Sequence, residues 1–203
     1  MTAGTNRDKP TPGSISLFTL LFAIGACYLA SLAYFLLHST NFAERNGIED
    51  ATRAVAGMHS ALPVTYTFDA KSPWIKSLAY GWNAPEAWGV WAGNTAAAVV
   101  LPPIPGTRTV PVCVDARFGY VRGQQHRWRL SMTVDGQPLG RPMRYAGHGP
   151  FDVRGMVSVA AGQPITIRFS GPVPVIPRAI SRATMDGRML SFSLLGVTIE
   201  PKC

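Results

Sequence analysis

The pattern of apolar and polar residues changes twice along this chain of 203 residues. Residues 15–37 are almost wholly apolar and hold no charged side chain, and a polar segment compatible with a helix follows as far as residue 62. After Pro63, short runs of alternating apolar and polar residues are separated by glycine and proline, which is typical of β-strands joined by turns. The pattern predicts an apolar helix, a connecting segment and a domain built mainly of β-strands.

The apolar run predicts a single transmembrane helix over residues 15–38. Twenty-three helical residues at ~1.5 Å each rise roughly 35 Å, which is enough to cross the hydrocarbon core of a bilayer. A cleaved secretory signal has a shorter apolar core, of about 7 to 15 residues. Ile24-Gly25-Ala26-Cys27 is similar to a lipoprotein processing site, but mostly apolar residues continue after Cys27. We therefore expect an uncleaved, single-pass anchor in a bacterial inner membrane.

The charges that flank this run weakly favour a cytoplasmic N-terminus. Arg7 and Lys9 precede it, whereas Arg45 and Arg53 follow it among acidic residues, and positive residues are retained on the cytoplasmic side. The expected organisation is a cytoplasmic tail (1–14), the transmembrane helix (15–38), a partly helical stalk ending near Gly57 (39–62) and a periplasmic domain (63–203).

Four alanines form a stripe of small side chains along the predicted membrane helix. Small residues at such spacing let a second helix approach closely, which favours a membrane-protein partner, although alanine is also simply common in bacterial anchors. The stripe consists of Ala23, Ala26, Ala30 and Ala33.

The region after Pro63 predicts an antiparallel, jelly-roll-like β-sandwich, because short strands follow one another without long helices between them. Asp135-Gly136 indicates a hairpin, since a type I′ turn needs positive φ at both central positions. Ala161-Gly162-Gln163 marks a similar turn. Strands are expected near 64–68, 87–91, 96–101, 109–116, 127–134, 143–145, 155–159, 165–170 and 189–199.

The stretch 81–91, Gly-Trp-Asn-Ala-Pro-Glu-Ala-Trp-Gly-Val-Trp, holds three of the five tryptophans and one carboxylate. An indole can fill a corner of a core or stack on the apolar face of a ligand. In a regular strand, Trp88 and Trp91 point to opposite faces, so at most one of this pair is expected to face solvent. Core and ligand surface both stay open as interpretations of each tryptophan.

This stretch, the small-residue strand 95–101 that follows it and the late sequence Asp186-Gly187-Arg188-Met189-Leu190 resemble a β-sandwich domain of unknown function appended to many bacterial membrane glycosyltransferases. The resemblance covers about residues 62–200 and rests on Pro-Glu, on Trp-Gly-x-Trp and on Asp-x-Arg-x-Leu. The late motif keeps one of the family's two acids, and Val175-Ile176-Pro177-Arg178 replaces a Ser-Pro turn. The resemblance implies association with a membrane glycosyltransferase or polysaccharide synthase.

The two motifs also supply the residue types that hold a sugar. Its flat C–H face stacks on tryptophan while amide, carboxylate and guanidinium groups satisfy its hydroxyls. The candidate glycan-binding residues are Trp82, Asn83, Glu86, Trp88, Trp91, Asp186 and Arg188.

The net charge of +8 falls entirely on residues 101–203, which carry thirteen Lys and Arg against five Asp and Glu. Twelve of the thirteen are arginines, which suit bidentate contacts with carboxylate or phosphate oxygens. Anionic polysaccharide, anionic lipid headgroups or an acidic subunit are therefore suitable neighbours; scattered solvated arginines are an equally open interpretation. The predicted anchor argues against a nucleic-acid partner.

The remaining side chains give little indication of catalysis, metal or cofactor. His59, His126 and His148 share no ligand spacing, and the sequence holds no Gly-x-Ser-x-Gly nucleophile motif. Glu86 with Asp186 is the one carboxylate pair considered for glycoside hydrolysis. The other acids of the domain are expected to serve the Asp135 turn or to be strand-edge charges (Asp115, Asp152 and Glu200).

Cys113 and Cys203 can pair in an oxidising compartment, whereas Cys27 lies in the apolar run. We expect a non-catalytic, membrane-anchored accessory subunit of a bacterial cell-surface polysaccharide or glycan synthesis or export system. The alternative is a structural subunit of another inner-membrane complex, without sugar binding.

Overall fold

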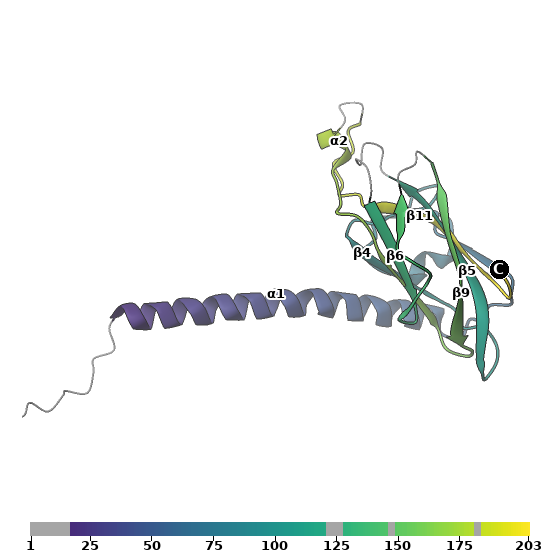
Figure 1. Cartoon of the computed structure of the whole chain (residues 1–203), viewed down its shortest axis with the longest axis horizontal. Helices are drawn as coiled ribbons and strands as arrows, with labels where there is room; N and C mark the ends of the chain where they lie inside the picture. The colour runs from purple at the N-terminus through teal and green to yellow at the C-terminus, as the bar shows by residue number, and fades with distance from the viewer. Residues whose placement is uncertain (1–16, 121–127, 146–148, 181–183) are drawn as a thin grey trace, which may run out of the picture. The chain divides into compact units, whose positions relative to one another are not determined.

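The computed structural model describes residues 17–120, 128–145, 149–180 and 184–203 (Figure 1). The chain divides into two compact units, Met1–Phe42 and Ala43–Cys203. The second unit is the β-domain, and it contains the last turns of the long helix α1 (Leu17–Val55).

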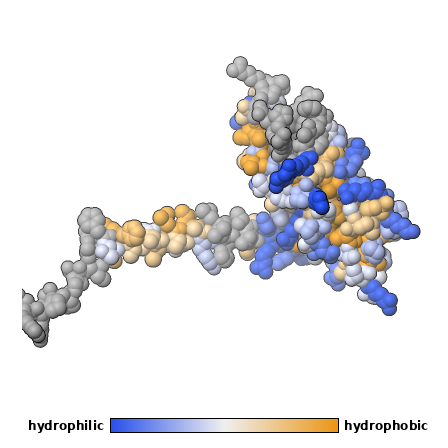
Figure 2. Space-filling view, in the orientation of Figure 1, coloured by the Kyte–Doolittle hydropathy of each residue, from blue (hydrophilic) through white to orange (hydrophobic). Residues whose placement is uncertain are grey.

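Helix α1 is continuous where a membrane helix and a separate stalk helix were predicted. No proline interrupts residues 17–55, so nothing in the covalent backbone forces a break, and the helix ends at Val55, close to the predicted Gly57. Its described side chains between residues 19 and 35 are mostly apolar (Figure 2) and exposed, and they include the four stripe alanines.

Among the helices that the structure describes, none has an apolar stretch of the length and hydropathy needed to cross a membrane. Residues 15 and 16 of the predicted transmembrane segment lie outside the described residues, as do the side chains of 17, 18 and 36–38.

The β-domain consists of two antiparallel sheets, as the sequence pattern predicts (Figure 1). Sheet A has the order β1-β11-β5-β9, with β3 also paired to β11, and sheet B has the order β2-β4-β10-β6-β7, with β8 also paired to β6. Sheet A comprises β1 (Val64–Thr67), β3 (Val90–Trp91), β5 (Thr109–Tyr120), β9 (Phe151–Ala160) and β11 (Phe192–Glu200). Sheet B comprises β2 (Leu78–Tyr80), β4 (Ala96–Leu101), β6 (Trp128–Val134), β7 (Gln137–Pro138), β8 (Met143–Tyr145) and β10 (Ile165–Ser170).

Strands β4, β8 and β10 have the bounds that the sequence predicts. Strands β5 and β9 are longer than predicted, because they pair with each other from Thr109 opposite Ala160 to Phe118 opposite Phe151. Four short elements lie outside the ranges predicted as strands or helices: β2, β7, the 3-10 helix η1 (Pro73–Ser77) and helix α2 (Pro177–Ile180). The β6–β7 turn confirms the hairpin signal, since φ is 49° at Asp135 and 80° at Gly136.

The core lies between the sheets and is centred on three phenylalanines. Phe118 and Phe192 of sheet A meet Phe169 of sheet B with ring centroids 5.7 and 6.1 Å from it, and all three side chains are buried. Alternate residues along the same strands point away from the core. This alternation defines the outer face of sheet A, which carries Gly119 and Ser193.

The last turns of α1 cover part of sheet B. Ala51 and Val55 are buried against Val100 of β4, with Ile48 and Ala79 packed beside them. The predicted stalk is therefore partly an element of the domain's own packing.

A disulfide joins Cys113 of β5 to Cys203, 90 residues further along the chain. Since β5 and β11 are neighbours in sheet A, the bond ties the segment after β11 to the middle of that sheet.

Replacing both cysteines by serine is expected to lower the free energy of unfolding by about 4 kcal/mol, because a closed loop of this length restricts the unfolded chain. Urea unfolding of the full chain in detergent, followed by tryptophan fluorescence, measures the loss. The wild type with reductant should match the double variant. Equal midpoints for the oxidised wild type and the double variant would contradict a stabilising bond.

Candidate functional site

The early and late sequence motifs meet in the folded domain. Arg188 donates from its terminal nitrogen to Glu86 Oε1 at 2.6 Å and to Asp186 Oδ2 at 2.7 Å. Beside this contact, Asn83 Nδ2 donates to the carbonyl oxygen of Met189 at 3.1 Å. The structure thus brings together four of the seven predicted site residues. We refer to Glu86, Asp186 and Arg188 as the motif clamp.

The motif clamp is an ion-pair network in which one guanidinium binds two carboxylates, so its formal net charge is −1. Hydrogen bonds from the Arg188 side chain, and then from its backbone N–H, hold the pKa of Asp186 below its usual range. In return, Asp186 first and Glu86 second raise the pKa of Arg188. A general acid in glycoside hydrolysis needs a raised pKa and room for the sugar between two carboxyl groups. Asp186 does not meet the first requirement, because its pKa is lowered, and one guanidinium holds both carboxylates.

A short helix supports the late motif. It lies in the segment where this sequence lacks the Ser-Pro turn of the family that it resembles. Helix α2 (Pro177–Ile180) places the Arg178 side chain beside Gly187, and the Arg178 N–H donates to the carbonyl oxygen of Asp186 at 3.0 Å. The motif clamp is therefore hydrogen-bonded to the segment that connects β10 to β11.

Trp82 lies at a corner of the core. Its indole N–H donates to the carbonyl oxygen of Ala98 at 2.7 Å. Its ring meets Phe169 and Phe192 edge-on, with centroids 5.7 and 5.8 Å away. Of the two interpretations open for this tryptophan, the structure favours core packing.

Trp88 and Trp91 lie on the same side of the domain, so the prediction that they point to opposite faces is wrong. Their ring centroids are 5.3 Å apart and their planes are nearly perpendicular, at 82°. The regular strand begins only at Val90. Before it, the Glu86 N–H donates to the carbonyl oxygen of Gly89, and the resulting turn redirects Trp88.

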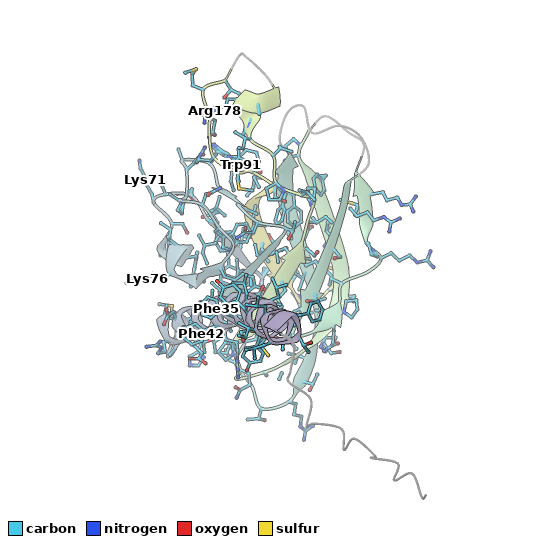
Figure 3. All side chains as sticks on the ribbon, turned by 90° about the vertical axis from the view of Figure 1, so that its left-hand side faces the viewer. Phe35, Phe42, Lys71, Lys76, Trp91 and Arg178 are labelled. Atoms are coloured by element: carbon cyan, nitrogen blue, oxygen red, sulfur yellow. A yellow bond between two sulfur atoms is a disulfide. The ribbon has the colours of Figure 1, made fainter. Side chains whose placement is uncertain are left out.

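The two indoles line a hollow of about 260 Å³ on the outer face of sheet A. Trp91, which is labelled in Figure 3, is half-buried, whereas Trp88 is 43% exposed. We call this site the aromatic hollow; its lining residues are Trp88, Trp91, Gly119, Pro150, Ser193 and Leu195.

Ser193 gives the aromatic hollow a polar floor. Its side chain is only 1% exposed, and its Oγ has no hydrogen-bond partner among the residues that the structure describes. It lies in register between Trp91 of β3 and Gly119 of β5. A Cβ at Gly119 would collide with Ser193 Oγ. Leaving a buried hydroxyl unpaired costs about 1–3 kcal/mol.

A second hollow, of about 450 Å³, lies on the same face and was not predicted. It contains three threonines and two carboxylates, and Thr65 and Thr198 place their Oγ1 atoms 3.0 Å apart. We call it the polar hollow; its lining residues are Thr65, Thr67, Asp115, Arg117, Asp152, Leu195, Gly196 and Thr198.

Asp115 and Asp152 were expected to be strand-edge charges; Asp152 does lie on β9, at the edge of sheet A, whereas the expectation is wrong for Asp115. Asp115 is on β5, which lies between β11 and β9 in sheet A. Burial, and then the neighbouring Asp152, raise the pKa of Asp115. Alternation along β1 and β5 shows which residues face outward, but only the order of the strands shows that they share a hollow.

The arginines differ between the two sheets. In sheet A, Arg117 pairs with Asp152 at 3.9 Å, and Arg154 pairs with Glu200 at 2.6 Å. In sheet B, Arg129 and Arg144 are exposed register partners on β6 and β8, and neither forms an ion pair with any acidic residue that the structure describes. The excess of positive charge in the sequence is therefore contributed in part by Arg129 and Arg144 on sheet B.

The described residues contain no group of three or more His, Cys, Asp or Glu side chains placed to hold a metal ion.

Comparisons with known proteins find only weak structural similarity. No protein-family model matches the chain, and no curated protein matches it. A Podospora anserina GH26-CBM35 β-(1,4)-mannanase is 15% identical with a TM-score of 0.43, over 70% of this chain and 28% of the mannanase. A family 35 carbohydrate-binding module from Clostridium thermocellum is 10% identical with a TM-score of 0.40, over 68% of this chain and 98% of the module.

The CBM22-1 xylan-binding domain of Paenibacillus barcinonensis Xyn10C is 12% identical with a TM-score of 0.43, over 68% of this chain and 92% of that domain. At these values the similarities carry no argument about the ligand of this chain, and the functional argument rests on the hollows themselves.

Replacing Arg188 by alanine should destabilise the domain by about 1 kcal/mol at neutral pH, the scale of a partly exposed ion-pair network. The folded-state pKa of Asp186 lies below its unfolded value, so its stabilisation is present above the unfolded value and is lost as the pH falls through the folded one. The difference between wild type and variant should therefore shrink below about pH 4.

Urea midpoints of the full chain in detergent, measured at pH 7, 5 and 3.5, test this dependence. Arg144→Ala, at an arginine without a described ion pair, serves as the matched control and should show no such pH effect. A wild-type-to-Arg188→Ala difference that stays constant from pH 7 to pH 3.5 would refute the assigned role of Asp186.

Proposed function

We propose that this chain is a non-catalytic, membrane-anchored accessory protein whose jelly-roll-like β-sandwich binds glycan outside the cytoplasm of a bacterium. Its system would be the synthesis or export of a cell-surface polysaccharide or related glycan. The observation that carries the proposal is the aromatic hollow, in which two indoles surround a buried hydroxyl without a described partner.

The aromatic hollow suits a sugar because a pyranose ring is apolar on its faces and polar at its rim. Trp88 offers an exposed indole surface, and Trp91 stands nearly perpendicular to it, so one indole can stack on a ring while the other borders it. Aromatic surface with few, well-placed polar groups is typical of small-molecule sites.

The motif clamp supports binding rather than hydrolysis. Glu86 and Asp186 are both engaged by Arg188, and the lowered pKa of Asp186 keeps that group ionised at neutral pH. Asp186 is thereby not prepared to protonate a leaving group.

The disulfide and the apolar run support a periplasmic domain on an inner-membrane anchor. Disulfides persist in oxidising compartments, and the bond between Cys113 and Cys203 is part of the fold. Residues 15–37 carry no charge and are long enough, as a helix, to cross a bilayer. The anchor would be single-pass, with its N-terminus in the cytoplasm.

The resemblance of the two motifs supports a membrane glycosyltransferase or polysaccharide synthase as partner, and the alanine stripe offers a face for its helices. A structural subunit of another inner-membrane complex is the second candidate. It is favoured by Trp82, Glu86 and Arg188, whose side chains bind other parts of the domain and so have an internal role.

Replacing Trp88 by alanine should weaken glycan binding at least about tenfold, which corresponds to 1.4 kcal/mol of lost contact. The thermal midpoint should change little, because Trp88 is 43% exposed and lies outside the buried core. A glycan array probed with the full chain in detergent, with a parallel thermal melt, measures both quantities.

Trp88→Phe, which keeps an aromatic face, should retain most of the binding. Trp82→Ala should instead lower stability by roughly 3 kcal/mol, since it removes a core side chain. Unchanged binding by a well-folded Trp88→Ala variant would exclude the aromatic hollow as the sugar site.

Enlarging the alanine stripe by Ala26→Leu together with Ala30→Leu should leave the chain in the membrane fraction but abolish copurification of its membrane partner, because leucine prevents close helix approach. Leu21→Ile with Leu32→Ile, on the opposite side of α1, is the matched control. Affinity purification from detergent extracts, followed by mass spectrometry, measures partner recovery. Recovery of the chain in the soluble fraction would refute the anchor, and equal recovery of the partner by both variants would refute the docking face.

A further inference from the structure

We infer that the glycan is an extended, uncharged or amine-bearing chain that lies along the strands of sheet A, with sugar units in both the aromatic and the polar hollow. This inference deepens the proposed function and rests on it. What it adds is the length, direction and charge class of the ligand.

The two hollows adjoin each other on the outer face of sheet A. Leu195 lines both of them, and it lies where the pairing of β11 with β5 shifts register between Leu194 and Gly196. Along β5, Gly119, Arg117 and Asp115 alternate with core residues and so share the outer face. The site therefore continues along the strand direction from the indoles toward Thr198.

The length of this site exceeds one sugar ring. From Gly119 to Asp115, the register partners of Ser193 and Thr198, four residues of β5 advance about 13 Å at ~3.3 Å each. The hollows have volumes of about 260 and 450 Å³, each near or within the range of ligand pockets, about 300–1,000 Å³. A single sugar in the aromatic hollow would leave the polar hollow empty, whereas a chain of several units reaches both.

The side chains of the polar hollow favour hydroxyl groups over acidic ones. Threonine hydroxyls at positions 65, 67 and 198 can donate and accept, and Asp115 and Asp152 can only accept while ionised. Arg117 and Arg154 are already paired with acidic partners. A uronate or phosphate here would meet two carboxylates and no unpaired arginine of this set.

Burial and charge at Asp115 also favour a ligand without acidic groups. Its pKa is raised by burial and by Asp152, so its negative charge is already disfavoured at this position. A further negative charge from a ligand would add to the repulsion, whereas a hydroxyl or an amine would relieve it. The anionic ligand anticipated from the overall charge thus does not fit this face. Arg129 and Arg144, which have no ion pair among the described residues, lie on the other sheet.

The test measures how affinity depends on chain length. The probes are β-1,4-linked glucose and N-acetylglucosamine oligosaccharides of one to six units, their deacetylated glucosamine counterparts, and alginate oligosaccharides of the same lengths as the acidic class. Isothermal titration uses the full chain in detergent. Affinity for a neutral or amine-bearing series should rise at least tenfold from two to four units and then level off, and alginate should bind at least tenfold more weakly.

Variants separate the two hollows. Thr65→Val with Thr198→Val, which preserves the shape of the strands, should remove the gain between two and four units and leave disaccharide binding unchanged. Thr133→Val with Thr166→Val, on the outer face of sheet B, is the matched control and should change nothing. Trp88→Ala should weaken binding at every length.

Two further results would contradict the proposals, and they do so at different levels. Equal affinity for all lengths, or tighter binding of alginate, would overturn the extended site and leave the aromatic hollow as a sugar site. No binding of any probe by the wild type would overturn the proposed function, and this inference with it.

Discussion

The packing of three phenylalanines between the sheets is the interaction on which the rest of the domain depends. Phe118 and Phe192 come from neighbouring strands of sheet A, and Phe169 comes from sheet B. Because side chains alternate along a strand, placing these rings inside forces Gly119 and Ser193 to the outer face. The floor of the aromatic hollow is thus a direct consequence of the core. The glycine leaves space above the hydroxyl, where any larger side chain would collide with it.

The close spacing of the tryptophans within residues 81–91 does not imply one common role for them. Trp82 uses its indole N–H and both ring edges inside the domain, whereas Trp88 and Trp91 line a surface hollow. The turn between Glu86 and Gly89 separates these roles, and Arg188 holds Glu86 from the other end of the chain. The motif clamp therefore positions the indole surface without touching it, and its carboxylates serve structure.

The two sheets differ in how their arginines are paired, and the net charge of the chain does not show this difference. On sheet A, arginines stand beside acidic partners and the polar hollow carries two carboxylates. On sheet B, two arginines face each other across β6 and β8, an arrangement that destabilises a strand pair by about 0.2–1 kcal/mol. A neutral ligand on one face and a negatively charged neighbour on the other are compatible with the same excess of positive charge.

The sequence by itself determined the class of fold and most of its strands, because alternation of period two and turn residues are local properties of the chain. It located β4, β8 and β10 to the residue and the Asp135-Gly136 turn, and it marked Cys113 and Cys203 as the cysteines able to pair. Tertiary structure alone decided which strands are neighbours, and hence that Ser193 lies between Trp91 and Gly119 and that Asp115 lies in a hollow. It also decided that Trp88 and Trp91 share a side, since a turn closed by one backbone hydrogen bond replaces the regular strand that the local pattern predicts. Contacts between residues a hundred positions apart depend on the packing of the whole chain, and no local pattern encodes them.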